Sequence, residues 1–182
     1  MVTYLLKPSE ELLVSNEGLL RMYALEAIRK RRSIRKFTGD PISKEDLEMI
    51  VDAGRLAASG YNRQPWDFII VTDPGMISKL KVAAQWMDKA AAIIAVVMDT
   101  SAEFWLEDGS AAVENMLIAS TALGYGSCWL EGDTLPLEEE LKTLLAIPSE
   151  KRLLTLVPIG VPAECPTKDK KPLEKVIHWE RW

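Results

Sequence analysis

The chain has few of the residues from which metal sites and covalent catalytic sites are built. Its 182 residues include one histidine, His178, and two cysteines, Cys128 and Cys165. The cysteines lie far apart and form no CxxC pair, which excludes zinc-finger spacings. A lone histidine also excludes a Cys/His or Ser/His/Asp catalytic set built on any other histidine. We expect no metal site, no disulfide framework and a cytoplasmic location.

Long apolar runs and an excess of positive charge are also missing. The longest apolar run, from Ala90 to Met98, has nine residues, whereas a membrane-spanning helix needs about 20. The first residues carry several glutamates and lack the regions of a signal peptide. With 22 basic against 27 acidic residues the net charge is −5, which argues against general nucleic-acid binding. We therefore expect neither a membrane nor a nucleic acid as a partner.

Amide side chains are scarce, and two of the five fall in one short stretch. Asn62 and Gln64 lie within residues 59–66, which read Ser-Gly-Tyr-Asn-Arg-Gln-Pro-Trp. Amide groups recognise the polar edges of ligands, and Pro65 restricts Gln64 to an extended conformation. The stretch predicts a shaped loop that contacts a ligand, although an ordinary helix-to-strand loop ending in a packed tryptophan explains it as well.

A cluster of basic residues precedes this loop. Arg31, Arg32, Ser33 and Arg35 lie within five positions. Arginine binds phosphate through two parallel hydrogen bonds, and a serine hydroxyl supplies a further donor. The cluster therefore indicates a phosphate site. The alternative is a solvated helix end, where cations complement the helix dipole.

A third stretch, residues 124–133, combines three glycines with a cysteine and a tryptophan. Gly124, Gly126 and Gly132 permit close approach of a ligand to the backbone. The alternative is a helix cap, a buried strand and a turn. Cys128 is then expected to be a small core residue rather than a nucleophile.

The remaining pattern predicts alternating helices and strands in one domain spanning 1–182. Helices are expected from about residue 18 to 28, and over 47–58, 76–84, 107–123 and 136–146; strands are expected over 66–72, 91–98, 127–130 and 153–161. The strand at 91–98 is apolar on both faces and should be central. Residues 1–18 are expected to form an N-terminal extension, and residues 162–182 a polar arm that packs over another surface. The uneven connections favour a mixed-sheet α/β or α+β fold.

Four motifs in this order resemble the FMN-dependent nitroreductase family. Its Arg-x-Ser-x-Arg/Lys pattern matches Arg31, Ser33 and Arg35. Its Asn-x-Gln-Pro-Trp and Gly-x-Gly-Ser-Cys-Trp patterns match residues 62–66 and 124–129. The closing pattern Val-Gly-x-Pro-Ala-Glu appears as residues 159–164, with isoleucine first, and is followed by a Lys-x-Lys element.

The resemblance implies a three-layer α+β fold with a mainly antiparallel central sheet, and a homodimer that binds FMN in its interface. The C-terminal arm would cross onto the partner subunit. The implied cofactor-binding residues are Arg31, Arg32, Ser33, Arg35, Asn62, Gln64, Pro65, Trp129, Leu130, Glu131, Gly132, Lys168 and Lys170. No side chain is implied to be catalytic, because flavin N5 carries the chemistry.

Within this set the resemblance gives each group a role. Arg31 and Ser33, with the two arm lysines, would hold the phosphate and ribityl chain, and Arg35 would lie near the pyrimidine edge of the flavin. Asn62, Gln64 and Pro65 would come from the partner subunit. Backbone N–H groups of Glu131 or Gly132 would reach N5.

Three functions remain open from the sequence. The first is an oxidoreductase that takes hydride from NAD(P)H and reduces a nitroaromatic, quinone or related small-molecule acceptor by a ping-pong mechanism. The second is a flavin-binding or sensing module without turnover, or another reaction of the same superfamily such as dehalogenation or flavin fragmentation. The third is an unrelated acidic domain that uses residues 29–36 as a patch for a nucleic acid or a protein partner.

Overall fold

The computed structural model describes residues 24–182. The expected N-terminal extension and the start of the first expected helix lie outside the described residues. The structure is built on a four-stranded antiparallel sheet with the order β1-β2-β4-β3. Its strands are β1 (Trp66–Val71), β2 (Ala92–Asp99), β4 (Lys151–Gly160) and the short β3 (Gly126–Ser127).

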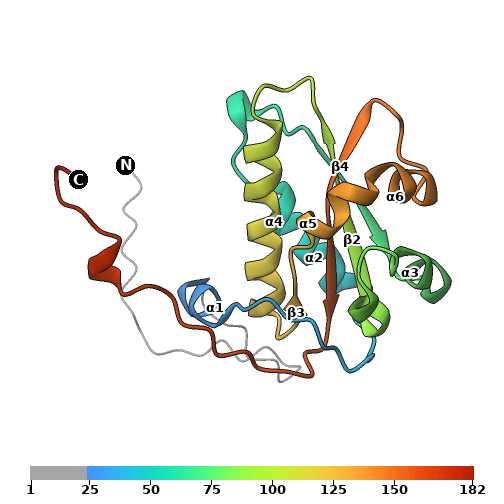
Figure 1. Cartoon of the computed structure of the whole chain (residues 1–182), viewed down its shortest axis with the longest axis horizontal. Coiled ribbons are helices and arrows are strands. Elements are labelled where there is room, and N and C mark those ends of the chain that lie inside the picture. Colours follow the sequence, from blue (N-terminus) through green and yellow to red (C-terminus); the bar gives the residue numbers. More distant parts are fainter. Residues whose placement is uncertain (1–23) are drawn as a thin grey trace.

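Helices cover both faces of this sheet, so that the fold has three layers (Figure 1). On one face α2 (Lys44–Arg55) and α4 (Trp105–Ala122) pack over a core that includes Ile94, Val96 and Met98. On the other, α3 (Pro74–Leu80) and α6 (Glu138–Leu144) lie over Ile93, Ala95 and Val97. Side chains alternate along a strand, and both sets of β2 are buried. The expected central strand and the expected α+β fold are therefore confirmed.

Local signals explain where the main helices begin. Ser43 caps α2 by accepting a hydrogen bond from the Asp46 backbone N–H at 3.1 Å, and Asp73 caps α3 through the Met76 N–H at 2.7 Å. Pro74 occupies the first turn of α3, where a missing N–H does no harm. Two minor helices complete this part, α1 (Ala24–Lys30) beside α4 and α5 (Glu131–Thr134) beside β4.

A β-bulge interrupts the pairing of β2 with β4. Val96 pairs with Thr155 and Val97 with Leu153, so Leu154 is an additional residue on β4. Its side chain lies against α4 at Gly109, where an added Cβ would come within 2.5 Å of it. The bulge therefore fills the space below the first turns of α4 with a leucine, and glycine at position 109 makes room for it.

The strand expected over 127–130 is wrong beyond Ser127. Cys128 and Leu130 still donate backbone hydrogen bonds to Pro158 and Leu156, but the chain then turns into α5. Pro158 has no N–H to return, so a full ladder cannot form opposite it. The glycines of this stretch differ in backbone conformation. Gly124 has a φ of 87° after α4, whereas Gly132 has no positive φ and lies within α5.

The C-terminal arm leaves the body after β4 (Figure 1). At its base, the Thr38 N–H donates to Val161 O and the Ala163 N–H donates to Lys36 O. Further along, it forms only the short 3₁₀ turn η4 (Leu173–Lys175) among the described residues. Several of its apolar side chains face solvent, including Leu173, Val176, Trp179 and Trp182.

A nearly buried carboxylate fixes α6 to β4. Glu138 is 8% exposed and accepts hydrogen bonds from Arg152 Nε at 2.7 and 2.9 Å and from the Leu153 N–H at 3.0 Å. Burial alone would raise the pKa of Glu138. The hydrogen bonds from Arg152 and Leu153 outweigh burial and lower that pKa below its ordinary value.

The first prediction follows from this pair. Glu138→Gln should lower the free energy of unfolding at pH 7 by about 1–3 kcal/mol, because a charge-assisted hydrogen bond is lost. A lowered pKa gives stability that is complete above the ordinary glutamate value and is lost as the pH falls through the folded value. Urea unfolding curves should therefore converge for the two proteins as the pH drops below about 4. Glu140→Gln, on the exposed side of α6, is the matched control. A difference that stays constant down to acid pH would contradict the assignment.

The second prediction compares two glycines of the third motif. A Cβ on Gly126 would lie 2.8 Å from three atoms of Ile34, whereas a Cβ on Gly132 would meet nothing within 4 Å. Gly126→Ala should therefore overpack the contact with Ile34. We expect it to lower the free energy of unfolding by about 1–3 kcal/mol, and the melting temperature with it. Gly132→Ala should be neutral or slightly stabilising, since alanine favours a helix. Differential scanning calorimetry of both variants measures this, and an equal loss of stability in the two variants would contradict the prediction.

Candidate functional site

The basic cluster and the glycine-containing stretch lie side by side. After α1 the chain runs parallel to β3, with a bridge between Ser33 and Ser127 and a hydrogen bond from the Ile34 N–H to Ser127 O at 2.9 Å. Because Ile34 is buried against Gly126, Ser33 and Arg35 on either side of it are held in a fixed position. The fold thus brings together three of the four motifs, because β3 also pairs with residues 159 and 160 of the fourth motif.

Cys128 lies at the centre of this contact. It is 1% exposed, and its thiol donates to the Trp129 carbonyl at 3.8 Å. Burial raises the pKa of the Cys128 thiol, and Arg35, Ser33 and Arg31 only partly oppose this. The thiol is therefore protonated at neutral pH, and the expectation of a core residue is confirmed.

The three arginines of the cluster have different partners. Arg31 Nε lies 3.3 Å from Glu114 Oε1 on α4. Arg32 Nη1 donates to the carbonyls of Arg29 and Arg31 at 2.8 Å, so this side chain closes the end of α1. Arg35 donates only its backbone N–H, to Glu164 Oε1 at 2.6 Å. Within residues 24–182 the Arg35 guanidinium has no ion pair, so it is available to an anion.

The residues after Cys128 present backbone rather than side chains. Trp129 packs against the core beneath α2 and α4, and Leu130 is buried. Glu131 and Gly132 form the first turn of α5, where N–H groups have no acceptor inside the helix. The Glu131 side chain lines a hollow of about 160 Å³ together with Trp105 and Arg152.

The amide loop lies elsewhere in the subunit. Residues 59–65 lead into β1, which forms the sheet edge opposite to β3. The amide loop and β3 also lie at opposite ends of the strands. Trp66 pairs with Met98 near the C-terminal end of β2, and Ser127 pairs with Ile159 near the C-terminal end of β4. Because β2 and β4 are antiparallel, these two ends are opposite ends of the sheet. Asn62, Gln64 and Pro65 are therefore not brought to the basic cluster of their own chain.

The conformation of the amide loop differs from the one expected. Tyr61, Asn62 and Gln64 have φ values of 52°, 57° and 50°, in the left-handed region. The expected extended conformation of Gln64 is wrong. Its N–H donates to Ser59 Oγ at 3.1 Å, and its side-chain Nε2 donates to Asn62 O at 3.3 Å. These local hydrogen bonds outweigh the steric preference that Pro65 imposes.

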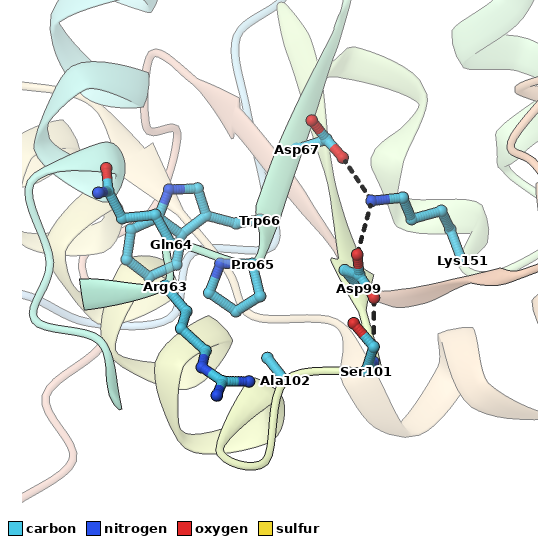
Figure 2. A pocket seen from close by; sticks show the side chains of 9 residues that line it. All are labelled: Arg63, Gln64, Pro65, Trp66, Asp67, Asp99, Ser101, Ala102 and Lys151. Atoms are coloured by element: carbon cyan, nitrogen blue, oxygen red, sulfur yellow. Dashed lines mark hydrogen bonds and ion pairs between the residues drawn. The ribbon is translucent and has the colours of Figure 1, made fainter. Parts of the chain in front are cut away.

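A hollow of about 350 Å³ beside this loop was not anticipated from the sequence (Figure 2). In it, Lys151 Nζ lies 3.3 Å from Asp67 and 3.6 Å from Asp99, and Arg63 reaches towards Ala102. The three charged residues belong to three neighbouring strands, β4, β1 and β2. Only the pairing register brings them together, so no sequence spacing could have revealed the cluster.

The two lysines of the arm follow Pro166, which lines a hollow of about 190 Å³ together with Arg32 and Ile34. Lys168 and Lys170 are exposed and, among the described residues, make neither a hydrogen bond nor an ion pair. Figure 1 shows the arm running away from β4 past α1. The fourth motif itself, residues 159–164, is joined to the third through the pairing of β3 with β4, and to the basic cluster through the bond from the Arg35 N–H to Glu164 Oε1.

Two kinds of feature are missing from the part of the chain that the structure describes. None of the helices within residues 24–182 combines the length and the apolar character that a membrane crossing needs. In the same part of the chain, no three histidine, cysteine or acidic side chains converge in a way that could hold a metal ion.

Comparisons with known proteins agree with this arrangement. The model of the Nitroreductase family matches residues 28–81 and 75–161. A protein of Archaeoglobus fulgidus, provisionally named NADH dehydrogenase/NAD(P)H nitroreductase, is 38% identical over 87% of this chain and 98% of its own length. A protein of Methanothermobacter thermautotrophicus with the same provisional name is 36% identical, over 89% of each chain.

A solved structure extends the likeness to the fold. It is that of a provisionally named nitroreductase of Desulfovibrio desulfuricans in complex with FMN. It superimposes with a TM-score of 0.76 at 30% identity and covers 87% of this chain and 97% of the other. The order of the motifs, the three-layer fold and these matches agree, and the chain belongs to the nitroreductase family.

Proposed function

We propose that the protein is an FMN-dependent oxidoreductase that takes hydride from NAD(P)H and reduces a nitroaromatic, quinone or related acceptor by a ping-pong mechanism. The observation that carries the proposal is that backbone pairing with Ser127 holds Ser33 and Arg35 beside residues 127–132, at one edge of the sheet. It rests also on relatives named for NAD(P)H and on a structural neighbour that binds FMN.

The residues at this edge fit FMN. FMN needs hydroxyl and cationic donors that the protein has not already used. The Ser33 hydroxyl is such a donor for the phosphate end, and the Arg35 guanidinium is one for the pyrimidine edge. Ser127 Oγ is buried and has no hydrogen-bond partner among the described residues, which leaves a polar atom in this contact to be satisfied. Glu114 and Glu164 offset part of the positive charge, but the guanidinium groups of Arg32 and Arg35 form no ion pair among the described residues, so the cluster stays cationic.

Each residue then has a defined task. Arg31 and Ser33, with Lys168 and Lys170, would hold the phosphate end, and Arg35 would favour negative charge at the pyrimidine edge. Arg32 contributes through the end of α1, since its Nη1 is already bonded to backbone carbonyls. The N–H groups of Glu131 and Gly132 would orient the ring. When bound, FMN supplies hydride transfer at N5.

The placement of the amide loop supports a site shared by two subunits. Asn62, Gln64 and Pro65 lie at the far edge and the far end of the sheet from Ser33, so a second copy is needed to bring them to the flavin. The uncovered apolar side chains of the arm 162–182 and of α1 support the same conclusion, since a partner would cover them. We propose a homodimer of single-domain subunits. Its free thiols Cys128 and Cys165 suit the reducing cytoplasm.

The decisive test is the reaction of the bound flavin. The purified protein should show the absorbance of an oxidised flavin, NADH or NADPH should bleach it in the absence of oxygen, and a nitroaromatic or quinone should then restore it. A ping-pong enzyme completes these half-reactions separately. A protein that holds flavin but is not bleached would be a flavin-binding module without turnover, and one that holds no flavin would leave the basic cluster to another ligand.

A subunit-mixing experiment tests the shared site. Arg31→Ala and Gln64→Ala should each weaken FMN binding about tenfold or more, because each removes a ligand contact. In a mixed dimer, one site combines the intact Arg31 of one chain with the intact Gln64 of the other. Exchange of subunits should then restore roughly a quarter of the sites. Lys36→Ala, an exposed cation beside the cluster, is the control for charge alone. Absence of any recovery on mixing would show that both residues serve the same chain's site.

A further inference from the structure

A carboxylate that the proposed function does not use lies inside the first turn of α4. Asp108 is 5% exposed. Its Oδ1 accepts a hydrogen bond from the Gly60 backbone N–H at 2.9 Å, across 48 residues of sequence. Its Oδ2 is buried without a hydrogen-bond partner among the described residues. Buried polar groups are normally hydrogen-bonded. Among the described residues, the one hydrogen-bond partner of the Asp108 carboxylate is Gly60 of the amide loop.

The backbone held by this contact is unusual. Gly60 is followed by Tyr61 and Asn62 and, after one more residue, by Gln64, all three in the left-handed region. L-residues are rarely found there, and such conformations persist only where the surroundings hold them. The loop's other bonds are largely internal: Gln64 N–H to Ser59 Oγ, Asn62 N–H to Ser59 O, and Arg63 N–H to Gly60 O. They shape the loop but do not anchor its start.

Gly60 is held from two sides by Asp108 of α4 and by Phe104, the residue that precedes α4. A Cβ at this position would lie 2.4 Å from the Phe104 ring, so glycine is needed for the loop to lie against the ring. Phe104 also packs against Tyr61, with their ring centroids 6.3 Å apart. Phe104 restricts the loop by packing, whereas Asp108 supplies a direction, because a hydrogen bond to a charged acceptor is strong and oriented. The N-terminal end of an 18-residue helix also stabilises negative charge there.

We propose that Asp108 is a positioning residue, which holds the loop 59–65 in the conformation that presents Asn62 and Gln64 to the flavin of the partner subunit. The proposal rests on the proposed function, because it assigns Asn62 and Gln64 to that flavin. Asp108 itself touches neither cofactor nor acceptor. It acts only through the Gly60 N–H, so the acceptor oxygen is the feature that matters, and the charge strengthens the hydrogen bond.

Three variants separate this role from general stability. Asp108→Leu removes the acceptor, while Asp108→Asn keeps Oδ1 in place. Ser120→Ala is the matched control: Ser120 is fully buried in the same helix, but its hydroxyl donates to Met116 O of that helix and not to the loop. We expect FMN to dissociate about tenfold more readily from the leucine variant, and within about twofold of wild type from the other two.

Subunit mixing provides a readout that a merely structural role would not move. The leucine variant should recover FMN binding when mixed with Arg31→Ala, because one site then combines an intact cluster with an intact loop. It should not recover with Gln64→Ala, because both chains then carry a damaged loop. A chain damaged in its overall fold would recover with neither. Recovery with Gln64→Ala, or an unchanged FMN affinity of the leucine variant, would overturn the proposal.

Hydrogen exchange of the Gly60 amide keeps the proposal testable without the cofactor. In the cofactor-free wild-type chain this amide should be protected, in Asp108→Asn it should remain so, and in Asp108→Leu it should exchange at least about tenfold faster. Fast exchange in wild type would overturn the proposal even if the leucine variant failed to fold. A wild-type protein that binds no FMN but protects Gly60 would refute the proposed function, and with it the flavin-presenting role, while leaving the anchor intact.

Discussion

Backbone pairing between the segment after α1 and the edge of the sheet is the interaction on which the candidate site depends. The Ile34 N–H bonds to Ser127 O, and a few residues later Thr38 and Lys36 pair with the base of the arm. This short strip has no strong strand pattern of its own. It is held because Ile34 packs onto Gly126 and Phe37 onto Gly160, where the absence of a Cβ lets the chains approach. Without that approach, Ser33 and Arg35 would have no fixed relation to residues 127–132.

The regular elements could be predicted because their signals are local. The apolar run of β2 acts within a few residues, and the structure has the strand where the pattern indicates. The helices expected over 47–58 and 76–84 are present but begin earlier, at Lys44 and Pro74, because Ser43 and Asp73 cap them. Ends were less predictable where a distant partner decides. The strand after Ser127 stops because Pro158, on another strand, lacks an N–H.

The site divides in the same way. The motifs indicated Arg31, Ser33 and Arg35, because these residue types have an evident affinity for phosphate. They did not indicate that Arg32 closes α1, that Gln64 is left-handed, or that Lys151 meets Asp67 and Asp99. Those features follow from hydrogen bonds and from strand register, and neither can be predicted from the spacing of residues along the chain. Asp108 was hidden for the same reason, since its partner is a backbone N–H on a distant loop.

The additional residue in β4 has a mechanical consequence. Leu154 projects from the bulge against Gly109, the residue after Asp108, and thereby sets the height of the first turns of α4 above the sheet. The position of the amide loop is thus linked, through one backbone hydrogen bond, to the number of residues in a strand. Removing one residue from β4 would restore an even ladder, withdraw Leu154 from beneath α4 and let that end of the helix tilt. The number of residues in β4 therefore affects the position of the amide loop, although the two do not pair with each other.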